Sequence, residues 1–332
     1  MAAKRIAIIG AGNMARTRGR AFLETGQAEI CSVSSRRMAS AKACASELAS
    51  DVYFDDYRRL AESNPDAILL EVPHKVQDEI TLWALEAGFD LLIGGCLASN
   101  LGSGEQIAAL AKTKGCVVEV GYQRRYDPAW KKIKQLVESK ELGIPVMSTS
   151  MALWNADPEK WYYDQETSGG MPLTHMSYCY LNAIRWILGK PIWVSAVANK
   201  LVETGPTRVL EESCGAHITF ENGSFLSATA SYVGPEGMSS AETRFVFTDG
   251  GIQTNDDNLS IKIFRGGEDE IRAFCKTPSP FVRQARAFLE AVESRGNGQN
   301  PPDDAILDNR IAECISCSVR EQRAILVYEE KC

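Results

Sequence analysis

Glycines and small residues near the start of the chain are spaced for phosphate binding. The segment Gly10-Ala11-Gly12-Asn13-Met14-Ala15 follows a short β-rich run over residues 4–9 and precedes a helix-compatible stretch. In such a turn Gly10 permits a tight bend, Gly12 lets the backbone approach a pyrophosphate, and Ala15 keeps helix and strand close. Helix N-terminal amides then bind the phosphates, so we include Asn13 and Met14 in this cofactor-binding turn. A glycine turn with a structural role alone is the alternative.

A second group of residues bears on which nicotinamide cofactor is bound. The next predicted strand ends at Ser34, and Ser35, Arg36 and Arg37 follow it. NAD-selective sites usually carry Asp or Glu here to accept hydrogen bonds from the ribose, whereas serines and arginines suit the 2′-phosphate of NADP. The sequence therefore favours NADP(H) over NAD(H). Two solvated arginines at a helix start are the alternative.

Protic side chains further along the chain are candidates for proton transfer to a substrate oxygen. His175, Cys179 and Asn182 stand at positions i, i+4 and i+7, so they share one face of a helix. An imidazole can protonate a carbonyl oxygen as hydride arrives, and the phenol of Tyr162 can donate to a developing alkoxide. A histidine that bonds within its helix and a tyrosine that packs in its loop are the alternatives. A zinc pair of His175 and Cys179 lacks two further ligands, so we expect no metal.

These candidates require a scaffold of alternating strands and helices. Over the first 120 residues, strand patterns alternate with helical ones, which predicts a parallel sheet covered on both faces. Ligands of such sheets bind at the carboxyl ends of the strands. The expected strands cover residues 4–9, 29–34, 67–72, 90–93 and 116–120, and the expected helices cover 14–25, 39–49, 76–87 and 104–114.

Beyond residue 122 the pattern changes to that of a second domain. An amphipathic helix over 128–139 precedes several β-type runs, and the pair Asn222-Gly223 between two of them is typical of a hairpin turn. We therefore predict an α/β chain with a Rossmann domain over 1–122 and an α+β domain over 123–332. The second domain is expected to hold strands at 194–199, 214–220, 225–231, 243–248 and 259–264, and closing helices at 281–294 and 303–327.

The chain as a whole has the composition of a globular protein. Of its 332 residues 45% are hydrophobic, and 36 basic against 43 acidic residues give a net charge of −7. Because nucleic-acid binding needs clustered Lys and Arg, we expect no such partner. No apolar run approaches the ~20 residues that cross a bilayer, and no signal peptide is apparent. Ten cysteines without a framework fit a reducing compartment, so we expect a cytoplasmic protein with no membrane partner.

Four stretches resemble the Gfo/Idh/MocA oxidoreductase family, the relatives of glucose-fructose oxidoreductase and inositol dehydrogenase. They are the glycine turn, Glu71-Val72-Pro73, Gly121–Pro128 and Gly169–Leu173, which span most of residues 4–190. The resemblance implies a second domain with a large, open, mostly antiparallel sheet, through which members often form homodimers or homotetramers. Contacts with cofactor or substrate are then expected at Val72, Pro73, His74, Tyr122 and Gln123.

The chain departs from this family at the reaction centre. Members usually carry Glu-Lys-Pro where this chain has Gly94-Gly95-Cys96, and an acid–base histidine where it has Cys179. In the family the face that carries His175 looks at the nicotinamide, so His175 or a tyrosine, Tyr122 or Tyr162, is the expected proton donor. Gly94 and Gly95 would let backbone and cofactor approach closely. The usual lysine–histidine mechanism is therefore not expected.

We predict an NADP(H)-dependent oxidoreductase with an atypical active site. The expected activity is reduction of a small carbonyl, imine or conjugated acceptor that is sugar-like or cyclic. Such an acceptor needs less stabilisation of alkoxide charge than a polyol, for which the missing lysine would cost several orders of magnitude in rate. A cofactor-binding regulatory protein without turnover and a cofactor-assisted lyase are the alternatives.

Overall fold

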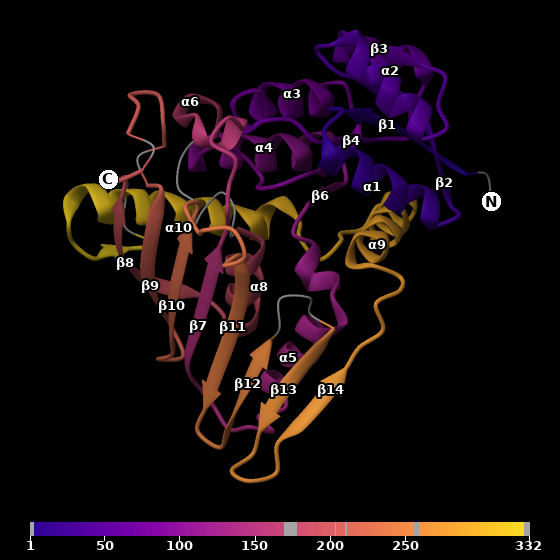
Figure 1. Ribbon diagram of the computed structural model, residues 1–332. Helices are drawn as coiled ribbons and strands as arrows, with labels where there is room; N and C mark the ends of the chain where they lie inside the picture. The colour runs from indigo at the N-terminus through magenta and orange to yellow at the C-terminus, as the bar shows by residue number, and fades with distance from the viewer. Residues whose placement is uncertain (1–2, 169–177, 203, 210, 255–258, 329–332) are drawn as a thin grey trace. The chain divides into compact units, whose positions relative to one another are not determined.

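The chain divides into two compact units, each built on its own sheet. The computed structural model describes residues 3–168, 178–202, 204–209, 211–254 and 259–328 (Figure 1). The first unit contains Met1–Tyr126 and Pro278–Asn309, and the second contains Asp127–Thr277 and Arg310–Cys332.

The sheet of the first unit has six parallel strands. In spatial order these are β3 (Tyr53–Phe54), β2 (Ala28–Ser34), β1 (Lys4–Ile9), β4 (Ala67–Leu70), β5 (Asp90–Ile93) and β6 (Val118–Val120). The residues of β4, β5 and β6 are all buried, as expected for a sheet that is covered on both faces. The order reverses between β1 and β4, which is the arrangement of a doubly wound nucleotide-binding sheet and confirms the predicted Rossmann fold.

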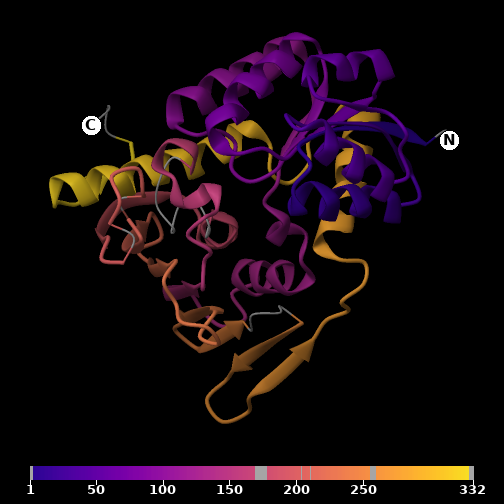
Figure 2. The same ribbon diagram turned by 45° about the horizontal axis from the view of Figure 1, so that its top comes forward.

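Helices surround this sheet (Figure 2). They are α1 (Asn13–Glu24), α2 (Met38–Glu47), α3 (His74–Glu86), α4 (Leu101–Lys114) and α9 (Pro280–Ser294), with the 3-10 helices η1 (Tyr57–Ser63) and η2 (Gln123–Tyr126). Helices α1, α2 and α9 share one apolar core with the sheet, and in it the rings of Phe22 and Phe288 meet edge to face at 6.1 Å. Helices α3 and α4 pack against each other.

Helix α9 comes late in the sequence but belongs to the first unit. A single boundary between residues 122 and 123 assigns residues 278–309 to the second domain, whereas the contacts assign them to the first. The reason is the apolar face of α9, whose Ala285, Phe288 and Leu289 lie in the core of the first unit. Each unit is therefore assembled from two separate segments of the chain.

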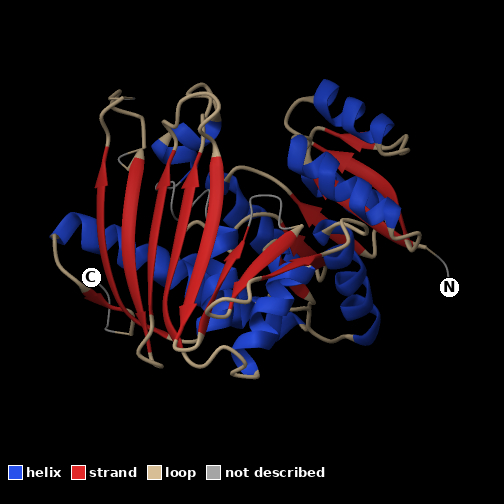
Figure 3. Cartoon of the chain, turned by 60° about the horizontal axis from the view of Figure 1, so that its bottom comes forward, coloured by secondary structure: helices blue, strands red, loops and turns tan. Residues whose placement is uncertain are grey.

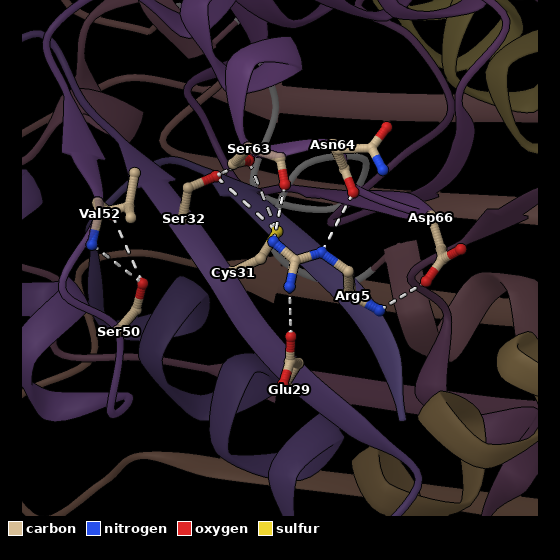
Figure 4. A network of polar contacts seen from close by, with 9 residues as sticks. All are labelled: Arg5, Glu29, Cys31, Ser32, Ser50, Val52, Ser63, Asn64 and Asp66. Atoms are coloured by element: carbon tan, nitrogen blue, oxygen red, sulfur yellow. Dashed lines mark hydrogen bonds and ion pairs between the residues drawn. The ribbon is translucent and has the colours of Figure 1, made fainter. Parts of the chain in front are cut away.

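At the amino-terminal edge of this sheet, Arg5 joins three segments of the chain (Figure 4). Its Nη1 atom donates to Glu29 Oε1 of β2 at 2.6 Å, and its Nη2 and Nε atoms donate to the carbonyl oxygens of Ser63 and Asn64. Its backbone N–H donates to Asp66 Oδ2 at 2.7 Å, just before β4 begins. These bonds hold the starts of β1, β2 and β4 together at the edge opposite the expected ligand site.

The second unit is built on a nine-stranded sheet (Figure 3). In spatial order the strands are β14 (Glu270–Ala273), β13 (Ser260–Phe264), β12 (Gly250–Thr254), β11 (Ser240–Phe247), β7 (Pro145–Leu153), β10 (Phe225–Ser231), β9 (Ser213–Phe220), β8 (Pro191–Asn199) and β15 (Ile325–Leu326). Strands β7 and β10 are parallel and the other pairs are antiparallel. The predicted mostly antiparallel sheet is therefore confirmed, including the hairpin turn at Gly223 with φ of 84°.

Helices pack against one face of this second sheet (Figure 3). They include α5 (Pro128–Glu138), α8 (Tyr178–Leu188) and the part of α10 (Pro302–Glu321) that begins at Arg310. Trp130 of α5 is fully buried, with its ring 6.2 Å from that of Phe245 in β11 and 6.4 Å from that of Tyr180 in α8. The loop after β7 carries the 3-10 helix η3 (Trp161–Tyr163) and the short helix α6 (Gln165–Ser168).

The last helix is shorter than the predicted range of 303–327. Helix α10 ends at Glu321, and Gln322 takes a left-handed conformation with φ of 55°, which stops the helix. Ile325 and Leu326 then form β15, which pairs with β8 at the edge of the sheet. Ile325 and Leu326, which continue the helical pattern of apolar residues in the sequence, therefore form an edge strand in the structure.

In the part of the chain that the structure describes, no helix is long and apolar enough to cross a bilayer. The same residues hold no group of three or more His, Cys, Asp or Glu side chains that could bind a metal ion.

Candidate cofactor and active site

The predicted phosphate-binding turn joins β1 to α1. Gly10 has a φ of 113°, and a Cβ atom there would overlap the carbonyl oxygen of Glu71, so the fold requires glycine. Gly12 is the N-cap of α1 in an extended conformation, and a Cβ atom built on it meets nothing within 4 Å. No described side chain caps this helix. The amides of Asn13 and Met14 therefore border open space, an arrangement that fits a pyrophosphate.

The end of β2 lies beside this turn. Gly10 N–H donates to the carbonyl oxygen of Ser34 at 2.8 Å, and the side chain of Ser34 is buried. Ser35 is half-buried, while Arg36 and Arg37 are exposed. Neither arginine forms an ion pair with a described residue. Both guanidinium groups are thus available to an anionic group at this edge of the sheet.

A buried ion pair lies at the carboxyl end of β4. Arg18 Nε of α1 is 2.6 Å from Oε1 of Glu71, and the two side chains are 4% and 11% exposed. Burial raises the pKa of Glu71, and the charge of Arg18 opposes this rise. Sequence reasoning treated Glu71 as part of a family-like stretch and did not consider Arg18. The available signal was a carboxylate inside the otherwise apolar run of residues 67–72.

The same ion pair accounts for the first of the two glycines that follow β5, and backbone conformation accounts for the second. A Cβ atom at residue 94 would overlap the Glu71 carboxyl group, so Gly94 is required while Glu71 takes this position. Gly95 has a φ of 81°, a conformation that residues with a side chain rarely adopt. The position of the Glu71 carboxyl group therefore disfavours a side chain at residue 94, and the backbone conformation disfavours one at residue 95.

Arg18 also connects β6 and α9 to this centre. Its Nη1 and Nη2 atoms donate to Gln284 Oε1 and to the Gly121 carbonyl oxygen, each at 2.6 Å. Gln284 Nε2 in turn donates to Oε1 of Glu119 at 3.2 Å. Glu119 is fully buried, which raises its pKa, and it also accepts from the Tyr126 hydroxyl at 2.7 Å. A continuous buried polar network therefore runs from β4 to the end of β6.

Tyr122, one of the predicted proton donors, follows β6 and is fully buried. Its carbonyl oxygen accepts from Asn300 Nδ2 at 3.2 Å, and Val120 N–H donates to the Asn300 carbonyl oxygen at 3.0 Å. Asn300 thus fixes the backbone that leads to Gln123, whose side chain is half-buried. Burial of the Tyr122 ring indicates a packing role, and its catalytic role stays a prediction.

The segment after β5 folds against the start of α3. Gln77 Nε2 donates to the Cys96 carbonyl oxygen at 2.7 Å. His74, the first residue of α3, is buried with its Nε2 atom 3.5 Å from Cys96 Sγ, while Val72 and Pro73 before it are half-buried. Burial raises the pKa of the Cys96 thiol to about 12. At neutral pH this sulfur is therefore a neutral thiol and not a nucleophile.

Tyr162, another predicted proton donor, belongs to the second unit. Its ring packs in an aromatic cluster, 6.1 Å from that of Tyr163 and 5.6 Å from that of Tyr232. Burial raises the pKa of its phenol, so the group is protonated at neutral pH. His175 lies outside the described residues, and Asn182 from the same predicted face is fully buried in α8.

The structure of the first unit brings most of the predicted cofactor residues to one edge of its sheet. They follow the carboxyl ends of parallel strands: Gly10 to Met14 after β1, Ser34 to Arg37 at β2, Val72 to His74 after β4, Gly94 and Gly95 after β5, and Gln123 after β6. The roles of the individual residues stay predictions.

Known proteins resemble this chain along most of its length. Residues 4–122 match the model of an oxidoreductase family with an NAD-binding Rossmann fold, and residues 130–253 match the C-terminal domain of the Gfo/Idh/MocA proteins. A levoglucosan dehydrogenase structure in complex with NADH and L-sorbose has the same fold, with a TM-score of 0.91 at 18% identity over 99% of this chain and 100% of that one.

Curated relatives match shorter stretches. The D-glucoside 3-dehydrogenase of Escherichia coli is 26% identical over 64% of this chain and 60% of its own length. The inositol 2-dehydrogenase of Rhodococcus erythropolis is 30% identical over 43% of this chain and 42% of its own length. The chain thus spans no more than about three fifths of either relative (60% and 42%). On the strength of both domain matches and their order, the chain belongs to the Gfo/Idh/MocA oxidoreductase family.

Proposed function

We propose that this chain is an NADP(H)-dependent oxidoreductase that acts on a sugar-like or cyclic substrate. The observation that carries the proposal is the turn after β1, where Gly10 is required by the fold but Gly12 borders open space beside the first amides of α1. The turn would hold the pyrophosphate of the cofactor, and the nicotinamide ring would supply or accept hydride. The substrates named for the two relatives, a glucoside and inositol, support a polyhydroxylated compound.

We infer reduction of an activated acceptor as the favoured direction. The fixed cation that lysine gives other members is absent at Gly95, whose φ of 81° disfavours any side chain. Without that cation, alkoxide charge must be met by a proton donor, for which His175 is the first candidate. The Cys96 thiol, with its pKa raised to about 12, is a poor acid for this step.

We infer a preference for NADP(H) from the end of β2. Arg36 and Arg37 are exposed, and no described carboxylate neutralises either of them. A 2′-phosphate would form charge-assisted hydrogen bonds with such groups. Levoglucosan dehydrogenase, by contrast, was captured with NADH.

We also propose that the outer face of the nine-stranded sheet binds a second copy of the chain. Trp193, Thr219, Phe225, Met147 and Val246 stand in one row across five strands. Trp193 and Val246 are 42% and 43% exposed, and the strand alternation directs the row away from the helix-covered face. A largely apolar row of this width is typical of an interaction surface and supports a homodimer or homotetramer.

The activity is tested by turnover in both directions. The protein with NADPH should reduce at least one small carbonyl, imine or enone of a sugar-like panel, and with NADP⁺ it should oxidise levoglucosan, methyl glucoside or myo-inositol more slowly. The absorbance of the reduced nicotinamide reports the rate. Tight cofactor binding with no turnover of any compound would instead support a regulatory protein.

Gly12→Ala tests whether the turn binds the cofactor. The methyl group meets no protein atom, so the free energy of unfolding should fall by no more than about 1 kcal/mol, which is the cost of alanine in place of glycine at an N-cap. Affinity for NADPH should fall at least about tenfold, because the methyl group fills the space for the pyrophosphate. Urea unfolding and NADPH fluorescence titration measure the two quantities. Gly102→Ala in α4 is the matched control, and equal NADPH affinity of both variants would refute cofactor binding at this turn.

The cofactor preference is tested by the double variant Arg36→Ala/Arg37→Ala. Loss of two charge-assisted hydrogen bonds should weaken NADPH binding by about 10- to 100-fold and leave NADH binding unchanged. Isothermal titration with both cofactors gives the ratio, and Lys42→Ala on the exposed side of α2 controls for loss of surface charge. A wild-type protein that binds NADH more tightly than NADPH would show the preference to be wrong.

The outer sheet face is tested by adding charge to it. Met147→Lys/Val246→Lys should convert an oligomer into monomers, because burying two lysines at an interface is unfavourable. Light scattering coupled to size-exclusion chromatography reports the mass. Asn297→Lys, on an exposed position of the first unit, should leave the mass unchanged. A monomeric wild-type protein would contradict the proposed interface.

A further inference from the structure

The ion pair of Arg18 and Glu71 lies where the doubly wound sheet changes direction. Glu71 is the first residue after β4, and its backbone N–H donates to the carbonyl oxygen of Ile9, the last residue of β1, at 2.8 Å. Dinucleotides cross such sheets between these two strands, with the adenosine half toward β2. The nicotinamide half of the cofactor must then lie over β4 and β5, whose carboxyl ends flank the side chain of Glu71.

Stability alone does not account for this pair. Both side chains are almost fully buried, and a buried ion pair is commonly no more stable than apolar residues of similar volume. Here the chain also supplies Gln284 Oε1 and the Gly121 carbonyl oxygen, each of which accepts one hydrogen bond from the guanidinium group of Arg18. An elaborate set of partners for one buried cation points to a role for the carboxylate that it holds.

The ion pair also occupies space that side chains at residues 94 and 121, on the neighbouring strand ends, would need. The carboxyl group of Glu71 occupies the place of a Cβ atom at residue 94, and Nη2 of Arg18 would lie 2.8 Å from a Cβ atom at residue 121. Gly94 and the ion pair therefore depend on each other, whereas a Cβ atom at residue 121 would also lie 2.9 Å from the backbone carbonyl oxygen of Ile93. A side chain at residue 94 and the present position of Glu71 exclude one another.

We propose that Glu71, held by Arg18, is a positioning residue for the nicotinamide half of the cofactor, and that it delivers from β4 the carboxylate that other family members carry at position 94. A carboxylate accepts hydrogen bonds from the ribose hydroxyls and the carboxamide of that half. Its charge also favours the oxidised ring, which is cationic, over the neutral reduced ring. This inference rests on the proposed cofactor binding and names the residues that orient the cofactor.

The first test is the isosteric variant Glu71→Gln, which keeps the volume and removes the charge. The ratio of the dissociation constants of NADP⁺ and NADPH should rise by about threefold or more, because only the oxidised ring loses an attractive charge. Asp90→Asn is the matched control, since Asp90 is buried and ion-paired with Arg295 at 2.6 Å at the opposite end of β5. It should lower stability and leave the ratio unchanged. An unchanged ratio in Glu71→Gln overturns the positioning role.

The second test is the exchange of the carboxylate between strands. Gly94→Glu and Glu71→Ser should each lower the midpoint of urea unfolding and weaken NADPH binding, the first by overlap and the second by leaving Arg18 unpaired. The double variant should recover most of both losses. If the losses of the two single variants add up in the double variant, or if the double variant does not fold, the mutual exclusion of a side chain at residue 94 and the present position of Glu71 is overturned. A wild-type protein that binds neither NADP(H) nor NAD(H) refutes the proposed function itself and this inference with it.

Discussion

One buried guanidinium group organises the first unit. Arg18 is 3% exposed and meets three partners from separate parts of the chain: the Glu71 carboxylate, Gln284 and the Gly121 carbonyl oxygen. A buried charge is tolerated only when its hydrogen-bonding groups are satisfied, so the ends of β4 and β6 and the helix α9 must all reach the same point. Gly94 follows from this requirement, because a Cβ atom there would overlap the carboxyl group of Glu71.

Most of the fold could be predicted from periodicity. The five strands expected in the first domain and the five expected in the second all exist, with ends displaced by a few residues, because burial on one or both sides leaves a clear pattern. Strands β3 and β15 have only two residues each, which is too short for a recognisable pattern of apolar residues. The membership of α9 in the first unit could not be predicted either, because an apolar helix face does not reveal which sheet it covers.

The candidate site was predictable only where backbone geometry carries the signal. Gly10 and Gly12 have the conformations that the fingerprint implies, since such turns depend on local sterics. The meaning of Gly94 could not be read from the sequence, because the side chain that requires it, Glu71, comes from another strand. The same holds for the backbone at Tyr122, whose carbonyl oxygen accepts a hydrogen bond from Asn300, a partner 178 residues away. Long-range contacts therefore decide what sequence motifs leave open.

The split composition of the first unit has a consequence for its synthesis. All six strands of its sheet have been made once the ribosome passes Val120, but Gln284 and Asn300 follow only after the strands of the second sheet up to β14. At 5–20 residues per second this interval lasts roughly 8–36 s. During it, Arg18 and Glu119 lack partners that the finished unit gives them, and the amino-terminal core is uncovered where α9 will pack. Completion of the first core on the ribosome is thus delayed until Asn300 has emerged.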